Sequence, residues 1–257
     1  MKKRLAYICL AAALLAGCSN EEPADAYPQG MGRIAVRCGA DRTVDTRAFA
    51  VPGADDFSLT LSGDDYTESW PTVAAFAAEE ERLFREGTYT ATIAWGDPEA
   101  EGPDRPCFRG EVTTQVKARR VNTIEIEARI ANSQTRVAAT EQFLRYFHDA
   151  EFTVTTGAGN KFVYTPAAGR EAEPVFVQAG TTLTVTGTAR QQSQTGQTEG
   201  PLVTFPAQRL DAAAPRTCHT FLFDAPDAGS ATLTIYLGDD EAEVVPIDLE
   251  MNDDAIE

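Results

Sequence analysis

The chain has 257 residues, with 39 acidic against 22 basic side chains and a formal net charge of −17. So acidic a chain is repelled by the phosphates of nucleic acids and by anionic lipid head groups, which excludes nucleic-acid binding. The chain is long enough to bury one large or two small hydrophobic cores.

The N-terminus predicts an export signal that ends at a lipid-attachment site. Three cations precede eleven mostly apolar residues, 5–15, a run too short to span a bilayer. The sequence Leu-Ala-Gly-Cys that ends at Cys18 resembles the bacterial lipobox, in which the cysteine is acylated and the chain is cleaved before it. We therefore predict a signal peptide over 1–17 and a membrane anchor at Cys18. The alternative is an ordinary signal peptide, or an uncleaved anchor, with a chance cysteine.

Residues 18–30 are polar and acidic and lack an apolar period, which predicts a tether. Glu21 and Glu22, close behind Cys18, resemble the signal that sends Bacteroidetes lipoproteins to the outer face of the outer membrane. The alternative is a solvated linker that is acidic by chance.

Residues 31–131 alternate between apolar and polar side chains, the pattern of strands with one buried face. Ile34, Val36 and Cys38 share one face of the first predicted strand, and the clearest alternation covers 123–130. Residues 71–86 break the pattern and predict a short helical turn.

Residues 132–257 begin with an amphipathic turn near Phe143 and continue with seven or eight predicted strands. Pro246 cannot donate to a ladder, so the last strand is predicted at a sheet edge or a bulge. We predict an all-β protein of two antiparallel β-sandwich domains, Greek-key and immunoglobulin- or transthyretin-like, over 31–131 and 132–257.

Cys38 and Cys107 lie in the first predicted domain and could form a disulfide, which would leave Cys218 over. The equal alternative is that all three are small buried hydrophobic residues.

The sequence predicts no catalytic residues and no cofactor. Its only histidines are His148 and His219, and it has neither a Gly-x-Ser-x-Gly motif nor a Gly-rich phosphate loop. Cys218 and His219 are neighbours on a predicted strand, so their side chains should point to opposite faces. We therefore predict that the protein is not an enzyme.

Carboxylates at the first, third and fifth positions of 97–102 resemble the start of a calcium loop. Phe108 stands where that loop needs a bidentate glutamate, so we predict a solvated hairpin and no metal site. Among the aromatic residues, Trp95 is predicted in the core, whereas Trp70, beside Pro71, is the candidate for contact with a ligand. The polar loop 191–200 is a further candidate for contact with a partner, or a solvated hairpin end.

Several short motifs in a fixed order resemble a Bacteroidetes lipoprotein family catalogued as domain of unknown function 4493. They are the lipobox, the acidic tether, Gly-Thr-Tyr-Thr at 87–90, Asn132, the glutamine-rich run 191–197, Phe-Pro-Ala at 205–207 and Thr-Leu-Thr-Ile at 232–235. The resemblance covers about residues 31–257 and brings no established active residue with it. More distantly, the plan is similar to fimbrillin-type adhesion proteins. That similarity implies strand exchange after cleavage behind an arginine, for which Arg42 and Arg47 are candidates.

Together these observations predict a non-enzymatic, lipid-anchored outer-membrane protein at the cell surface, in adhesion or fimbria-like assembly. Its partner would be a surface protein or a glycan. The alternative is a carbohydrate-binding module of a glycan-uptake system. A hydrolase is a further hypothesis, and no motif supports it.

Overall fold

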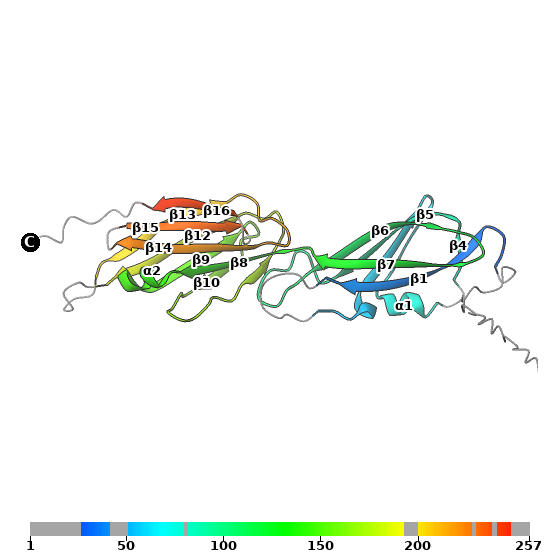
Figure 1. Ribbon diagram of the computed structural model, residues 1–257, viewed down its shortest axis with the longest axis horizontal. Helices are drawn as coiled ribbons and strands as arrows, with labels where there is room; N and C mark the ends of the chain where they lie inside the picture. The colour runs from blue at the N-terminus through cyan, green and yellow to red at the C-terminus, as the bar shows by residue number, and fades with distance from the viewer. Residues whose placement is uncertain are drawn as a thin grey trace, which may run out of the picture.

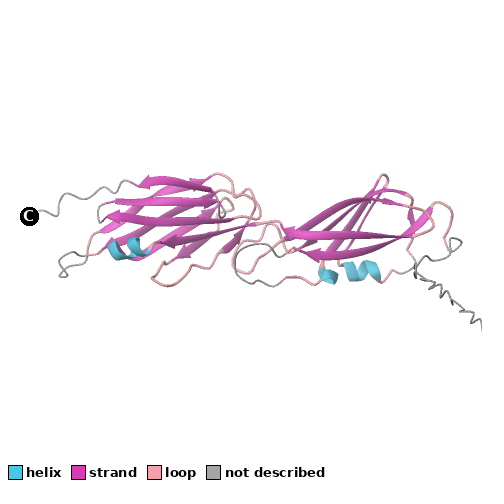
Figure 2. Ribbon diagram, in the orientation of Figure 1, coloured by secondary structure: helices cyan, strands magenta, loops and turns pink. Residues whose placement is uncertain are grey.

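The computed structural model describes residues 27–41, 51–79, 82–192, 200–227, 230–237 and 241–247. It confirms the all-β class: sheets dominate, with two short α-helices and one 3-10 turn (Ala54–Asp56) at their margins (Figure 2). Two groups of strands lie end to end along the long axis of the molecule (Figure 1). We call them the N-terminal half, up to residue 131, and the C-terminal half, from residue 132. The division into two domains at this point stays a prediction.

The N-terminal half holds one seven-stranded sheet in the order β3-β2-β5-β6-β7-β1-β4. Its strands are β1 (Met31–Ala40), β2 (Ser58–Gly63), β3 (Tyr66–Trp70), β4 (Phe84–Arg85), β5 (Gly87–Trp95), β6 (Phe108–Val116) and β7 (Val121–Ile130).

This sheet folds over between β6 and β7. Only Phe108 and Arg109 of β6 pair with β7, opposite Ile130 and Arg129. Gly110 follows, and a Cβ there would lie 2.6 Å from the Glu127 carbonyl oxygen, so the two strands cross closely because this position lacks a side chain. The alternating Ile124, Ile126 and Ile130 of β7 are buried against the opposite layer, as the sequence predicts.

The C-terminal half contains two sheets, ordered β10-β9-β12-β13 and β11-β8-β14-β15-β16. Their strands are β8 (Ser133–Ala139), β9 (Phe147–Thr156), β10 (Lys161–Tyr164), β11 (Val175–Val177), β12 (Leu183–Gln191), β13 (Leu202–Leu210), β14 (Cys218–Asp227), β15 (Ser230–Leu237) and β16 (Glu241–Ile247). β16, which contains Pro246, lies at a sheet edge, as predicted.

Two strand pairs depart from the antiparallel arrangement that the sequence predicts. β1 pairs with β7 in parallel, and β8 pairs with β14 in parallel. Alternation of side chains fixes which face of a strand is buried, and it carries no information about the direction of its neighbour. In each half the first strand therefore joins a strand formed much later in the chain.

The predicted helical turns are present and short. α1 (Val73–Ala77) begins at Thr72, whose hydroxyl accepts a hydrogen bond from the Ala75 N–H, and it buries Val73 and Phe76. α2 (Glu141–Tyr146) begins in the same way at Thr140 and buries Phe143. The capping hydroxyls satisfy N–H groups that the first turn would otherwise leave unpaired. No helix within the described residues is long and apolar enough to cross a bilayer.

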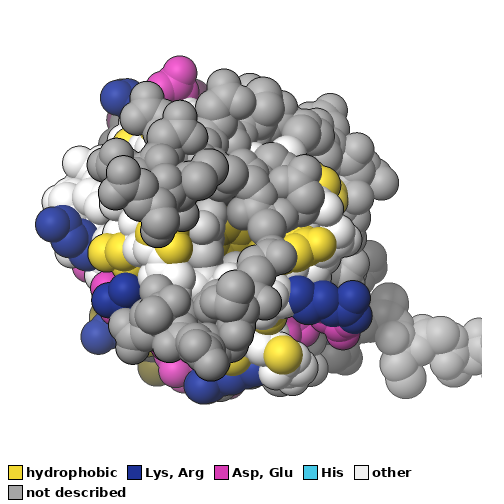
Figure 3. Space-filling model, turned by 90° about the vertical axis from the view of Figure 1, so that its left-hand side faces the viewer, with side chains coloured by type: hydrophobic (Ala, Val, Ile, Leu, Met, Phe, Trp, Pro, Cys, Tyr) yellow, Lys and Arg dark blue, Asp and Glu magenta, His cyan; other side chains and the backbone are white. Residues whose placement is uncertain are grey.

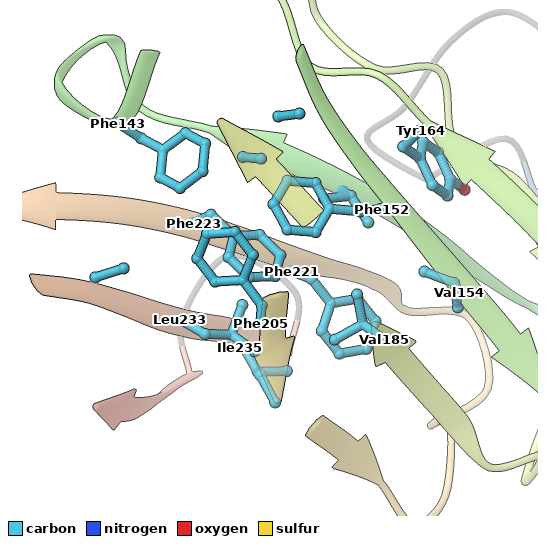
Figure 4. Close-up of a cluster of buried hydrophobic side chains, with 14 of the residues drawn as sticks. Phe143, Phe152, Val154, Tyr164, Val185, Phe205, Phe221, Phe223, Leu233 and Ile235 are labelled. Carbon is cyan, nitrogen blue, oxygen red and sulfur yellow. The ribbon is translucent and has the colours of Figure 1, made fainter. Parts of the chain in front are cut away.

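Each half has its own hydrophobic core. In the C-terminal half, Phe143, Phe152, Phe205 and Phe223 form an aromatic cluster between the two sheets, with Phe152 and Phe223 stacked at 3.8 Å (Figure 4). The core of the N-terminal half is built mainly from β2, β5, β6 and β7. It also includes Phe176 of β11, so one side chain from the C-terminal half belongs to the N-terminal core.

Candidate functional site

Trp70, the predicted ligand contact, is a core residue. Its side chain is 5% exposed, and its ring centroid lies 4.9 Å from that of Phe76. The indole N–H donates to Glu79 at 2.9 Å, and the Arg82 guanidinium lies 5.1 Å from the ring. Trp70 therefore presents no open ring face to a ligand, which corrects the prediction.

Both tryptophans contact the core of the N-terminal half, as predicted for Trp95 but not for Trp70. Trp95 is partly buried and packs against the core at Phe108, whereas Trp70 is deeper. The stretch before Pro71 reads as a loop in the sequence, but it forms β3, whose alternation turns Trp70 inward. Pairing with β2, which only the folded chain reveals, makes this segment a strand.

The possible disulfide between Cys38 and Cys107 does not form in the structure, where both are free thiols. Cys38 lies opposite Ile126 on one side of β7, and the Cys107 carbonyl accepts a hydrogen bond from Ala131 on its other side. Five residues along a strand span about 16 Å, and a disulfide needs Cα atoms within about 7 Å. Cys107 is buried, which fits the alternative that we left open. Burial raises the pKa of both thiols, that of Cys38 to about 11, so neither is a ready thiolate.

Cys218 and His219 lie side by side on β14, and no dyad geometry results. His219 is fully buried, while Cys218 is partly exposed on the other face of the strand. Neither ring nitrogen of His219 has a hydrogen-bond partner within the described residues, and the same holds for the hydroxyl of Thr135, which lies opposite it. Burial lowers the pKa of His219, and the nearby Ala214 backbone offsets part of this effect.

The acidic loop 97–102 joins the two halves of the molecule. The Glu101 carboxylate accepts hydrogen bonds from the Thr156 hydroxyl at 2.6 Å, the Asn160 amide at 2.8 Å and the Gln178 N–H at 3.1 Å. Gly102 and Phe176 exchange two backbone hydrogen bonds of 2.9 and 3.0 Å. The sequence predicts a solvated hairpin here, and the loop does connect the antiparallel strands β5 and β6. The contact of Glu101 with the other half is not visible in the sequence, because its partners lie more than fifty residues away.

No group of three or more histidine, cysteine, aspartate or glutamate side chains in the described ranges is placed to hold a metal ion. Cys18, Arg42, Arg47 and most of the polar loop 191–200 lie outside the described residues.

A pocket of about 490 Å³ opens at the end of the N-terminal half where β1 begins. The turn between β2 and β3, the strand β4 and the start of β5 line it. The rings of Tyr66, Phe84 and Tyr89 meet edge to face within it, with centroids 5.9 to 6.0 Å apart. Sequence reasoning missed this pocket, because three separate strands contribute its rings.

A smaller hollow of about 170 Å³ lies between β1 and α1. Arg33, Ile34 and Val36 of β1 line one side, and Phe76 and Phe84 belong to the other. Within the described residues, β1 pairs along this edge only with β4, at Met31 and Gly32. The rest of the edge faces the hollow and α1.

Comparison with known proteins gives one family match. The model of a family described as "Domain of unknown function (DUF4493)" matches residues 30–253. No curated protein matches the chain.

Solved structures offer distant similarities of fold. One is described as "putative polysaccharide binding proteins" from Bacteroides thetaiotaomicron, with 8% identity, a TM-score of 0.41, and coverage of 82% of this chain and 99% of that one. Another is described as a "putative cell adhesion protein" from Bacteroides eggerthii, with 8% identity, a TM-score of 0.40, and coverage of 89% and 98%. At these identities and TM-scores neither similarity carries a function over to this chain.

Proposed function

Since the chain belongs to the family described as domain of unknown function DUF4493, we propose its function from its own architecture. It is a non-enzymatic protein of the cell envelope, anchored by lipid at Cys18, and it acts through surface contact in adhesion or fimbria-like assembly. The observation that carries this proposal is the end-to-end arrangement of the two halves. β1 begins at one end of the long axis and β16 ends at the other (Figure 1). A lipid just before β1 would therefore hold the C-terminal half at the greatest distance from the membrane.

Contacts at the junction support this arrangement. Glu101, the paired backbones of Gly102 and Phe176, and the burial of Phe176 in the N-terminal core connect the halves by polar and apolar contacts. Asn132 adds a hydrogen bond from its amide to the Arg105 carbonyl at 2.8 Å. A junction held in this way transmits the position of the anchor to the far end of the molecule.

The far end offers a surface suited to contact. Figure 3 looks at this end and shows hydrophobic side chains with basic and acidic side chains around them. Leu202, at the start of β13, is 56% exposed. Exposed apolar groups surrounded by charged side chains are typical of contact surfaces.

Membrane fractionation tests the anchor, and protease treatment of intact cells tests the surface location. We expect the Cys18→Ala variant to leave the membrane fraction for the soluble one, because the acyl chains supply the attachment. We expect the wild-type C-terminal half to be cleaved while the outer membrane is intact. Unchanged fractionation of Cys18→Ala contradicts the anchor, and full protection of intact cells contradicts the surface location.

The position of β1 favours fimbria-like assembly as the form of contact. β1 is bonded along its length on one side only, to β7, and its other side borders the hollow beneath α1. Removal of β1 would expose the buried faces of Ile124 and Ile126, a groove that an extended strand from a second copy could fill. Arg42 and Arg47 follow β1 in the chain, where cleavage would release it.

N-terminal sequencing of the surface form tests this assembly. A chain that begins after Arg42 or Arg47 supports strand release. A chain that begins at Cys18 contradicts it and leaves adhesion by the anchored single copy.

A further inference from the structure

The pocket beside β4 has an aromatic floor and a polar rim. Tyr66, Phe84 and Tyr89 supply the rings, and Met31 and Leu83 add apolar walls. Asp64, Asp65, Arg85 and Glu86 line the same space with exposed side chains, so charged groups surround the rings. A cavity of about 490 Å³ falls within the range that small-molecule sites occupy.

Tyr89 carries a hydroxyl that the fold leaves without a partner. The side chain is 6% exposed, and its hydroxyl has no hydrogen bond to any described residue, whereas the Tyr66 hydroxyl donates to Glu68 at 2.6 Å. The Tyr89 hydroxyl is not among the fully enclosed polar atoms without partners, so it opens into the pocket that the ring lines. Water in the pocket can hydrogen-bond to this hydroxyl, and a ligand hydroxyl could take the place of that water.

The turn between β2 and β3 packs against the Tyr89 ring. Gly63 lies over the ring, and a Cβ there would stand 3.1 Å from the Cε1 atom of Tyr89. Burial raises the pKa of the Tyr89 hydroxyl, and the charge of Asp64 adds to this effect while Arg85 opposes it. The hydroxyl is therefore a neutral donor at physiological pH.

We propose that this pocket binds a neutral saccharide. A sugar hydroxyl both donates and accepts, so a single ligand can accept from Tyr89 and Arg85 and donate to the carboxylates of Asp64, Asp65 and Glu86. The apolar face of a sugar ring packs against aromatic side chains, and Tyr66, the least buried of the three rings, is the one placed for this contact.

Other occupants fit less well. A basic side chain only donates, so it would leave the hydrogen of the Tyr89 hydroxyl unpaired and would meet the charge of Arg85. An acidic sugar, or the acidic tether of this chain, would meet three carboxylates against one guanidinium. Trp70, the earlier candidate for a sugar contact, lines neither this pocket nor the smaller hollow between β1 and α1, so this pocket takes its place.

This inference goes beyond the proposed function, because it needs neither lipid attachment nor assembly. Its test uses the purified full chain in detergent. We would apply the chain to an array of short neutral oligosaccharides of glucose, mannose, galactose and xylose units, beside sialylated and galacturonate oligomers. Calorimetric titration with the neutral oligosaccharide that gives the strongest array signal would then compare variants.

We expect binding of at least one neutral oligosaccharide and none of the acidic ones. Tyr89→Phe, which removes only the hydroxyl, should weaken binding by about five- to tenfold. The double variant Asp64→Asn, Asp65→Asn should weaken it by about tenfold or more, because charged acceptors form stronger hydrogen bonds. Tyr146→Phe removes a tyrosine hydroxyl on α2, in the other half of the molecule, and should leave the affinity unchanged.

Thermal unfolding of each variant would confirm that it is folded, and both pocket variants change groups at the pocket surface. The proposal is overturned if no neutral oligosaccharide binds, if acidic oligomers bind better, or if Tyr89→Phe and the double variant bind as the wild type does. Loss of binding in Tyr146→Phe equal to that in Tyr89→Phe would overturn it as well.

Discussion

At the scale of single residues, His219 is a polar side chain that is buried without hydrogen-bond partners in the described part of the chain. Both of its ring nitrogens and the hydroxyl of Thr135 opposite it lack partners within the described residues. Burial favours the neutral ring, so the pKa of His219 is lowered in the folded protein. Stability must then depend on pH around the ordinary pKa of histidine, about 6.5.

We predict that the free energy of unfolding falls as the pH drops below about 6.5. Below that pH the unfolded chain binds a proton at His219, whereas the folded chain keeps the ring neutral. Each unit by which the two pKa values differ lowers the free energy of unfolding by up to about 1.4 kcal/mol. His219→Leu should flatten this part of the profile, whereas His148→Gln should keep it. Urea unfolding at a series of pH values measures the difference, and parallel profiles for wild type and His219→Leu would contradict the assignment.

The two tryptophans show what local sequence can and cannot settle about a residue. Trp95 shares an alternating face with Ile93, which correctly places it toward the core. Trp70 precedes a proline and looks like a loop residue, yet Glu79 and Arg82, nine and twelve positions on, enclose its ring. Its burial depends on Glu79 and Arg82 lying against it, and the alternation of apolar and polar residues in the sequence does not predict this contact.

At the scale of elements, the crossing of β6 over β7 turns one sheet into two layers. The pairing ends after Arg109, and Gly110 then lies against the backbone of Glu127 and Ala128. Gly39, on β1, has open space around the position of its absent Cβ. Gly39 therefore serves as a control for Gly110, since a side chain would be crowded at Gly110 and unhindered at Gly39.

We predict that Gly110→Ala destabilises the protein by about 1 to 3 kcal/mol, because its Cβ would meet backbone atoms that cannot move aside alone. Gly39→Ala should be neutral or slightly stabilising, since alanine reduces the freedom of the unfolded chain. Chemical unfolding of both variants measures this. Equal effects of the two substitutions would mean that the crossing tolerates a side chain.

The strands themselves were largely predictable, and their partners were not. Alternation located β1, β2, β5 and β7, because one face of each strand is buried. The parallel neighbours of β1 and β8 come from distant segments, and the pocket at Tyr66, Phe84 and Tyr89 draws its rings from three strands. Contacts between strands that are distant in the sequence arise only in the assembled sheet, so the pattern of residues along the chain cannot predict them.

At the scale of the whole molecule, one carboxylate joins the two halves. Both oxygens of Glu101 accept hydrogen bonds from the C-terminal half, at Thr156, Asn160 and Gln178. Glu99, two residues earlier, has an exposed side chain, and it is the Glu99 backbone carbonyl that accepts from the Gln178 amide. The neighbouring glutamate therefore provides a control for loss of charge in this loop.

We predict that Glu101→Gln loosens the junction and lowers the free energy of unfolding by about 2 kcal/mol. The glutamine NH2 group would replace one carboxylate oxygen and would then face a hydrogen-bond donor in place of an acceptor. Hydrogen exchange should quicken at the Gly102 and Phe176 amides, which bond across the junction. Glu99→Gln should leave both amides protected. Equal protection in wild type and Glu101→Gln would show that packing of Phe176 alone holds the halves.

The parallel pairs β1 with β7 and β8 with β14 set the order in which the chain can acquire its shape. Arg33 meets Val121 and Gln134 meets Cys218, each partner more than eighty positions further along. Closing so long a loop costs entropy before any contact offsets it, which slows folding. The opening strand of each half must wait, unpaired on that side, until nearly the entire half has emerged. The first half can nevertheless close on itself while the second is still being synthesised.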